Sequence, residues 1–128
     1  MKKLTLTFFA ILLTFSTFGQ INIDNLERVD GLWTKKGEKT SYTGQFIEYF
    51  ENGKIKGKGE FKDGVVNGLR IVYYENGNKS LERNYYSGII DGLSIEYYPS
   101  GKVKQEANFK NGKEDGTPLR KVSDFEDV

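Results

Sequence analysis

Carboxylates are the only candidate catalytic side chains in this sequence. The 128 residues contain no histidine and no cysteine, which excludes a Ser-His-Asp or Cys-His triad and any zinc site built from those ligands. Asp91 and Asp115 stand in similar contexts, IIDG and KEDG, and paired carboxylates can hydrolyse glycosidic bonds. Asn67 takes the equivalent place in VVNG, although an amide cannot do this chemistry. Because each of the three precedes a glycine, a turn-forming role explains them better than catalysis.

No other motif in the chain indicates a cofactor. Calcium loops of the repeat type need dense Asp-x-Asp spacing, which is missing. A phosphate loop would need a glycine-rich segment that follows a strand and opens a helix, and every glycine here has a turn or strand explanation instead. We therefore expect a non-enzymatic protein with no catalytic residue, no cofactor and no metal site.

A sequence pattern recurs every 24 residues along most of the chain. The segments YFENGK (49–54), YYENGN (73–78) and YYPSGK (97–102) repeat at this interval. Ten glycines follow it in three series, which are Gly53, Gly77 and Gly101; Gly64, Gly88 and Gly112; and Gly44, Gly68, Gly92 and Gly116. Internal repeats of this length indicate stacked copies of one structural unit.

Within each unit, apolar residues alternate with polar ones, which predicts β-strands. Asn-Gly, Asp-Gly and Ser-Gly pairs separate the strands, and glycine at these places supplies the positive φ that a hairpin turn needs. The sequence therefore predicts an all-β fold. We expect an antiparallel meander of 24-residue β-hairpin repeats that forms an elongated, twisted single-layer sheet.

The apolar residues fall on odd numbers in both strands of each unit, as Ile71, Tyr73 and Leu81 illustrate. The odd-numbered residues of one strand would then pair with odd-numbered residues of the next strand. Each connecting turn would therefore contain an odd number of residues. A type I turn with a glycine bulge meets this condition. The odd-numbered apolar side chains would form one face, which something must protect from water. The open alternatives are curvature of the sheet, the segment 21–33 as a short amphipathic helix, the tail 119–128, a second copy, or a foreign partner.

The even-numbered face is mostly charged, but it carries a row of aromatic residues. Phe50, Tyr74 and Tyr98 follow the same repeat step, and Tyr86 is a fourth candidate near them. We expect this row to stay exposed. It is either a binding strip for a partner, or packing in which each ring covers the neighbouring strand.

The first residues, MKKLTLTFFAILLTFSTFGQ, have the three parts of a bacterial secretory signal peptide. The basic start is Lys2 and Lys3, the apolar run is 4–18, and the small residues Thr17 and Gly19 precede a cut before Gln20. The alternative is a membrane anchor, but the apolar run is shorter than the roughly 20 residues that span a bilayer. We expect an exported protein, periplasmic or extracellular in a bacterium, with no integral membrane segment after cleavage.

Cleavage there also changes the net charge. The whole chain carries 19 basic and 18 acidic residues, and losing Lys2 and Lys3 leaves 17 against 18, a net charge of −1. A nearly neutral protein has no bulk attraction for nucleic acid, so we expect no nucleic-acid partner.

The repeats resemble the MORN repeat variant. Besides the three tyrosine-rich turns, the resemblance rests on KDGVVNG (62–68), YSGIIDG (86–92) and KNGKEDG (110–116), and it departs from the pattern at Pro99 and Pro118. It covers about residues 42–117. The chain therefore divides into a signal peptide (1–19), an N-terminal capping segment (20–41), the hairpin repeats (42–117) and an acidic tail (118–128).

Proteins of this kind are often labelled antitoxins of the YwqK family, so the resemblance implies a protein-interaction module. An exported protein does not meet a cytoplasmic toxin, which leaves an antitoxin-like or immunity-like role in the envelope. The second hypothesis is an envelope ligand, a glycan or a lipid headgroup, bound on the aromatic strip. The partner would be an unidentified protein or envelope component, and self-association stays open.

Overall fold

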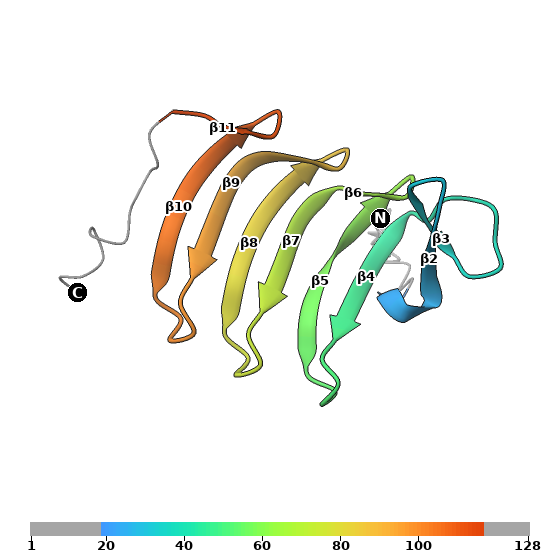
Figure 1. The fold of residues 1–128 in the computed structure, drawn as a ribbon, viewed down its shortest axis with the longest axis horizontal. Coiled ribbons are helices and arrows are strands. Elements are labelled where there is room, and N and C mark those ends of the chain that lie inside the picture. The colour runs from blue at the N-terminus through green and yellow to red at the C-terminus, as the bar shows by residue number, and fades with distance from the viewer. Residues whose placement is uncertain (1–18, 117–128) are drawn as a thin grey trace, which may run out of the picture.

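The computed structural model describes residues 19–116, which form one open sheet with a small hairpin at its N-terminal end (Figure 1). Six long strands lie side by side in chain order and pair antiparallel, so the predicted all-β meander of hairpins is confirmed. They are β4 (Gly44–Tyr49), β5 (Ile55–Lys62), β7 (Gly68–Tyr73), β8 (Lys79–Tyr86), β9 (Ile89–Tyr97) and β10 (Val103–Lys110).

Short elements complete the sheet and cover one end of it. β1 (Ile21–Asn22) pairs parallel with β4, β6 (Val65–Val66) pairs with β5, and β11 (Lys113–Glu114) pairs with β10. A 3₁₀ turn, η1 (Ile23–Asn25), leads into a separate hairpin of β2 (Leu26–Val29) and β3 (Leu32–Lys35).

Two predicted segments fall outside the described residues. They are the signal peptide (1–19), apart from Gly19, and the tail (118–128), which includes Pro118 and the segment 119–128 that was one of the expected covers of the sheet. Within residues 19–116, no helix has the length and apolar character of a membrane span.

The tyrosine-rich turns have the predicted form. Gly53 N–H donates to the Phe50 carbonyl at 2.9 Å, and Phe50 N–H donates to the Lys54 carbonyl at 2.8 Å. This is a type I turn closed by a glycine bulge. Gly53 has a φ of 82°, and Gly77 and Gly101 have φ values of 88° and 91°, so the expected positive φ is confirmed.

The expectation that all odd-numbered apolar residues share one face is wrong. Two features change which face of the sheet the odd-numbered residues of a strand occupy. One is a β-bulge directly after each of these turns. Tyr49 pairs with Ile55 but Glu48 pairs with Gly57, so Lys56 is an extra residue. Ser80 and Lys104 are the extra residues of the next two units. Beyond each bulge, even-numbered residues face odd-numbered ones.

The second feature is the other set of turns, which contain two residues and not an odd number. Lys62 pairs with Val65, and between them Asp63 and Gly64 have φ values of 50° and 80°. Positive φ at both central residues identifies a type I′ turn. Ser87-Gly88 and Asn111-Gly112 form the same turn. The odd residues of β4, β7 and β9 therefore lie on one face, and those of β5, β8 and β10 beyond the bulges lie on the other.

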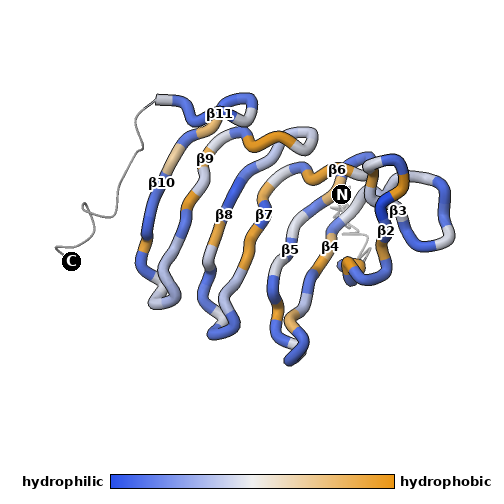
Figure 2. The backbone as a smooth tube through the Cα atoms, in the orientation of Figure 1, coloured by the Kyte–Doolittle hydropathy of each residue, from blue (hydrophilic) through white to orange (hydrophobic). Residues whose placement is uncertain are grey.

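We call these two surfaces the open face and the hairpin face. The open face carries Ile47, Ile71 and Ile95 with Tyr49, Tyr73 and Tyr97. The hairpin face carries Phe46, Phe61, Arg70, Arg83 and Ala107, and the β2–β3 hairpin packs on its N-terminal end. Figure 2 shows apolar and polar positions interleaved along the strands, with hydrophilic turns where β4 meets β5 and β7 meets β8.

The hydrophobic core lies where the hairpin meets the first repeat. Leu26, Phe46 and Phe61 are buried together, with the Phe46 and Phe61 rings stacked at 4.2 Å between centroids. The ring centre of Trp33, on β3, lies 5.5 Å from the ring centre of Phe61, so Trp33 covers Phe61. The segment 21–33 is thus one of the predicted covers, but it is not a helix. Asp30-Gly31, with φ values of 51° and 82°, makes a type I′ turn that folds the segment into a hairpin.

Candidate functional site

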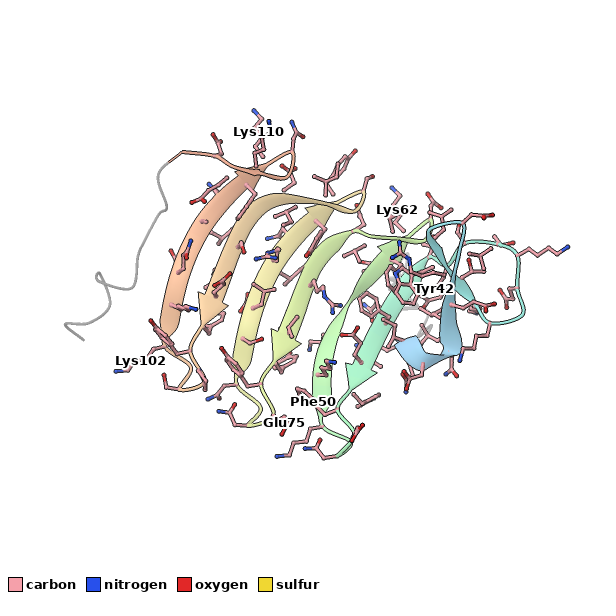
Figure 3. The ribbon with its side chains drawn as sticks, viewed as in Figure 1. Tyr42, Phe50, Lys62, Glu75, Lys102 and Lys110 are labelled. Carbon is pink, nitrogen blue, oxygen red and sulfur yellow. The ribbon has the colours of Figure 1, made fainter. Side chains whose placement is uncertain are left out.

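The predicted aromatic row lies in the turns and is half-buried, so the expectation that it is exposed is wrong. Phe50, Tyr74 and Tyr98 each begin a glycine-bulge turn, and Figure 3 shows Phe50 at that end of the sheet. The Tyr74 hydroxyl donates to the Tyr97 carbonyl at 2.6 Å, which ties one unit to the next. Tyr86 is exposed, but it is not near the row, because it ends β8 beside the turn at Ser87. This hydrogen bond gives Tyr74 a packing role, and Phe50 and Tyr98 occupy the equivalent positions of their own turns.

The candidate carboxylates lie at bends of the chain. The Asn67 side-chain oxygen accepts a hydrogen bond from Ser87 N–H at 3.0 Å, so it contacts the turn of the next unit and has a structural role. Asp91 occupies the equivalent bend and is exposed, and Asp115 N–H donates to the Asn108 carbonyl at 2.7 Å. Among residues 19–116, no three acidic side chains gather in an arrangement that could hold a metal ion.

The open face carries an alternating row across six strands. The strand pairings place its residues in the order Ile47, Lys58, Ile71, Glu82, Ile95 and Glu106. Isoleucines therefore come from β4, β7 and β9, and charged residues come from β5, β8 and β10. Lys58 Nζ lies 5.8 Å from the centre of the Tyr73 ring, so part of this charge is held over an aromatic surface.

Glu82 is the centre of a polar network on the open face. It accepts from Lys79 Nζ at 2.7 Å and from the Tyr97 hydroxyl at 3.0 Å. The hydrogen bond from Lys79 lowers the pKa of Glu82 and raises that of Lys79. Burial raises the pKa of Tyr97 to about 12, and the hydrogen bond to Glu82 and its negative charge act in the same direction.

Large apolar side chains of the open face are exposed. Tyr49, Ile55, Leu69 and Leu93 each keep between 38% and 46% of their surface accessible. Leu69 and Leu93 are equivalent residues of successive units, so the exposure repeats with the fold. Tyr49 and Ile55 pair at the glycine-bulge end of β4 and β5, whereas Leu69 and Leu93 lie near the opposite end of their strands. No described element covers either group.

The hairpin face holds ion pairs and a hollow. Arg70 Nη2 lies 2.8 Å from Glu48 Oε2, with its guanidinium 5.2 Å from the centre of the Phe46 ring. Further along, Arg83 contacts Ser94 at 3.1 Å and Glu96 at 3.6 Å. Between the β2–β3 hairpin and the repeats lies a hollow of about 300 Å³, which we call the junction pocket. Its side chains are Arg28, Trp33, Val65, Val66, Arg70 and Tyr85.

The repeat geometry is matched by a known family. Residues 42–63, 66–85 and 90–111 match the MORN repeat variant, and together these segments make up half of the chain. The chain belongs to the MORN repeat variant family. Repeats of this kind are generally protein-binding or membrane-binding modules, and the family is typically non-catalytic. No curated protein matches the chain.

This MORN repeat variant protein has surface features that the sequence reasoning missed. The exposed apolar side chains of the open face were missed because the sequence reasoning placed Leu69 on a protected face. The junction pocket was missed because its residues come from β2, β3, β6, β7 and β8 with no common spacing. The one sequence signal for the pocket was the dipeptide Asp30-Gly31, which is typical of a hairpin turn. The hairpin that it forms places Arg28 and Trp33 over the repeats.

Proposed function

We propose that this protein is an exported, non-enzymatic binding module that holds a partner protein on its open face. The observation that carries the proposal is the exposure of four large apolar side chains on that face, Tyr49, Ile55, Leu69 and Leu93. Single exposed apolar residues are ordinary, but several on one open face indicate an interaction surface. The array of paired strands presents these side chains on a rigid scaffold.

The chemistry of the open face suggests the kind of partner. Lys58, Glu82 and Glu106 alternate with the isoleucines, so apolar contact would be flanked by fixed charges of both signs. Apolar contacts supply most of the binding free energy in such an interface, while the charges select the partner and its register. This favours a protein with a complementary apolar strip. An immunity-like or antitoxin-like role in the envelope fits such a surface.

Export is part of the proposal and rests on residues 1–19. If the signal peptide is removed before Gln20, mass spectrometry of the protein from an envelope fraction will show a chain that has lost about these residues. A native envelope chain that still begins at Met1 would contradict export by this route. The expected compartment also decides where a partner should be sought.

A glycan is the second candidate ligand, because the structure places a tyrosine row on the open face. Tyr49, Tyr73 and Tyr97 are equivalent residues of successive units. They come from every second strand, so they stand about 10 Å apart. Aromatic rings at a regular interval can stack on the sugars of a polymer. Retention on purified cell-wall material, with no stoichiometric protein partner, would favour this alternative.

The test compares two double variants that make the same charge change. Leu69→Lys with Leu93→Lys places two charges among the exposed apolar side chains of the open face. Val29→Lys with Leu32→Lys places two charges at equally exposed positions of the β2–β3 hairpin, which packs on the opposite face. We expect the first variant to lose one stoichiometric protein in quantitative pull-downs from envelope extract, and the second to keep it. Equal retention by both variants would contradict the proposal, provided that both melt as the wild type does.

A further inference from the structure

The junction pocket has a lining of unusual composition for a surface where acidic and basic residues are otherwise mixed. It lies on the hairpin face, with Arg28 and Trp33 on one side and Arg70 and Tyr85 on the other. Val65 and Val66 lie between them, and turn glycines complete the lining. None of the described residues that line it is acidic. The pocket therefore combines two arginines, one of them paired with Glu48, with an aromatic and apolar surface.

Both guanidinium groups keep donors for a ligand. Arg28 Nη2 donates to the Gly31 carbonyl at 2.9 Å, and the guanidinium carbon lies 5.9 Å from the centre of the Trp33 ring. Arg70 Nη2 is engaged with Glu48. A guanidinium has five N–H donors, so each arginine can still contact an anion. Arg28 is exposed, and no carboxylate lines the pocket beside it. Arg70 is held in place by its ion pair with Glu48.

The rest of the lining suits an aromatic side chain. Trp33 and Tyr85 are half-buried, so each presents part of its ring to the pocket. The close approach of Gly64 to β3 fixes this arrangement, since a Cβ on Gly64 would lie 2.8 Å from Leu32 Cβ. A volume of about 300 Å³ is at the lower end of the range for ligand pockets. It accommodates one or two side chains of a peptide more readily than a large cofactor.

We propose that the junction pocket binds a short acidic segment of a partner protein that carries an aromatic side chain. The carboxylates contact Arg28 and the free donors of Arg70, and the ring lies between Trp33 and Tyr85. Charge complementarity supports this occupant, because Arg28 forms no ion pair with the described residues and no acidic residue lines the pocket itself. The site is on the face opposite to the proposed partner surface, so it is a second binding site and goes beyond that function.

The experiment uses Trp33, the only tryptophan of the chain, as a reporter inside the pocket. The probe is the blocked peptide Ser-Asp-Phe-Glu-Asp, titrated into the protein while tryptophan fluorescence is recorded. We expect a saturable change. Arg28→Glu should weaken binding by about tenfold or more, which corresponds to the loss of one charge-assisted contact. A peptide with alanine in place of phenylalanine should also bind more weakly, and one with lysines in place of the acids should not bind.

Two control variants make the result specific. Arg83→Ala removes a cation of the same face outside the pocket and should leave the affinity unchanged. The Leu69→Lys, Leu93→Lys variant of the open face should also bind the probe normally, so failure of this proposal is distinguishable from failure of the proposed function. Melting curves establish that Arg28→Glu is folded, as expected for an exposed residue of a hairpin.

Four outcomes would overturn the proposal. They are no saturable change, equal affinity in Arg28→Glu, equal affinity for the alanine peptide, and complete displacement of the probe by inorganic phosphate, which would indicate a simple anion site. The chain itself contains Ser123-Asp124-Phe125-Glu126-Asp127, outside the described residues. If Phe125→Ala in the full chain tightens binding of the probe tenfold, the chain's own segment is the occupant and the assignment to a partner is wrong.

Discussion

At the scale of single residues, Tyr97 shows how the open face changes the properties of a side chain. Its phenol is half-buried beside Glu82, so the charged phenolate is disfavoured by burial and by the neighbouring carboxylate. Its pKa is raised to about 12. A raised pKa means that folding favours the neutral phenol. The resulting stability is complete below the ordinary tyrosine pKa of about 10 and is lost as the pH rises from there toward 12.

The replacement Glu82→Gln tests this account. It removes the negative charge and weakens the hydrogen bond, so the pKa of Tyr97 should fall toward the ordinary value while burial keeps it somewhat raised. Titration of tyrosine absorbance in the folded protein should show the last of the eight tyrosines ionising at lower pH than in the wild type. Glu106→Gln is a weaker perturbation of the same phenol and serves as the control. An unchanged final ionisation step would contradict the role of Glu82.

Alanine substitutions at two glycines distinguish the free-energy cost of backbone strain from that of steric crowding. Gly77 has a φ of 88° and no atom near the position of a Cβ, whereas Gly64 has a φ of 80° and would place its Cβ 2.8 Å from Leu32 Cβ. Gly77→Ala should cost about 1–2 kcal/mol through the left-handed conformation alone. Gly64→Ala should cost more, because it also pushes β3 away and disturbs the Trp33 N–H to Gly64 carbonyl hydrogen bond of 2.9 Å. Free energies of unfolding in urea measure both, and equal costs would mean that β3 yields without resistance.

At the scale of elements, the sequence predicts the strands and their order but not which face each side chain occupies. The 24-residue step and the Asn-Gly turns sufficed for the meander, because both signals are local. The bulge residues Lys56, Ser80 and Lys104 have no shared side-chain type that could mark them, so the parity change is invisible in the sequence. Asp63-Gly64 did carry a signal, since this dipeptide is typical of two-residue type I′ turns.

The face that Ile71 occupies determines how much this residue contributes to stability. It was expected in a protected core, but the structure places it half-buried on the open face. Phe46 is the buried residue of a nearby strand on the other face. Phe46→Ala should lower the free energy of unfolding by about 3–5 kcal/mol, and Ile71→Ala should lower it by about half of that or less, because less apolar surface is lost from the interior. Thermal or urea denaturation distinguishes the two. A larger loss for Ile71→Ala would show that the open face is covered in solution.

At the scale of the whole molecule, stability is distributed unevenly along the sheet. Each repeat contacts only its neighbours, through strand pairing and through ties such as Gly88 N–H to the Val66 carbonyl and Gly112 N–H to the Ile90 carbonyl, both 2.8 Å. The aromatic core lies at the N-terminal end, under the β2–β3 hairpin. At the other end, the described part of the chain pairs with the outer side of β10 only at Phe109 and Lys110.

Hydrogen exchange should report this gradient. In a repeat protein whose units are linked only to neighbours, the end with little buried surface opens more often than the end with the core. We expect amides that bond between β9 and β10 to exchange about ten times faster or more than those that bond between β4 and β5. Phe46→Ala should raise exchange chiefly between β4 and β5 and so reduce the difference. If all strand amides exchanged at one common rate, in the wild type and in the variant, the sheet would open as a single unit. The terminal repeat would then owe its order to cooperation with the distant core.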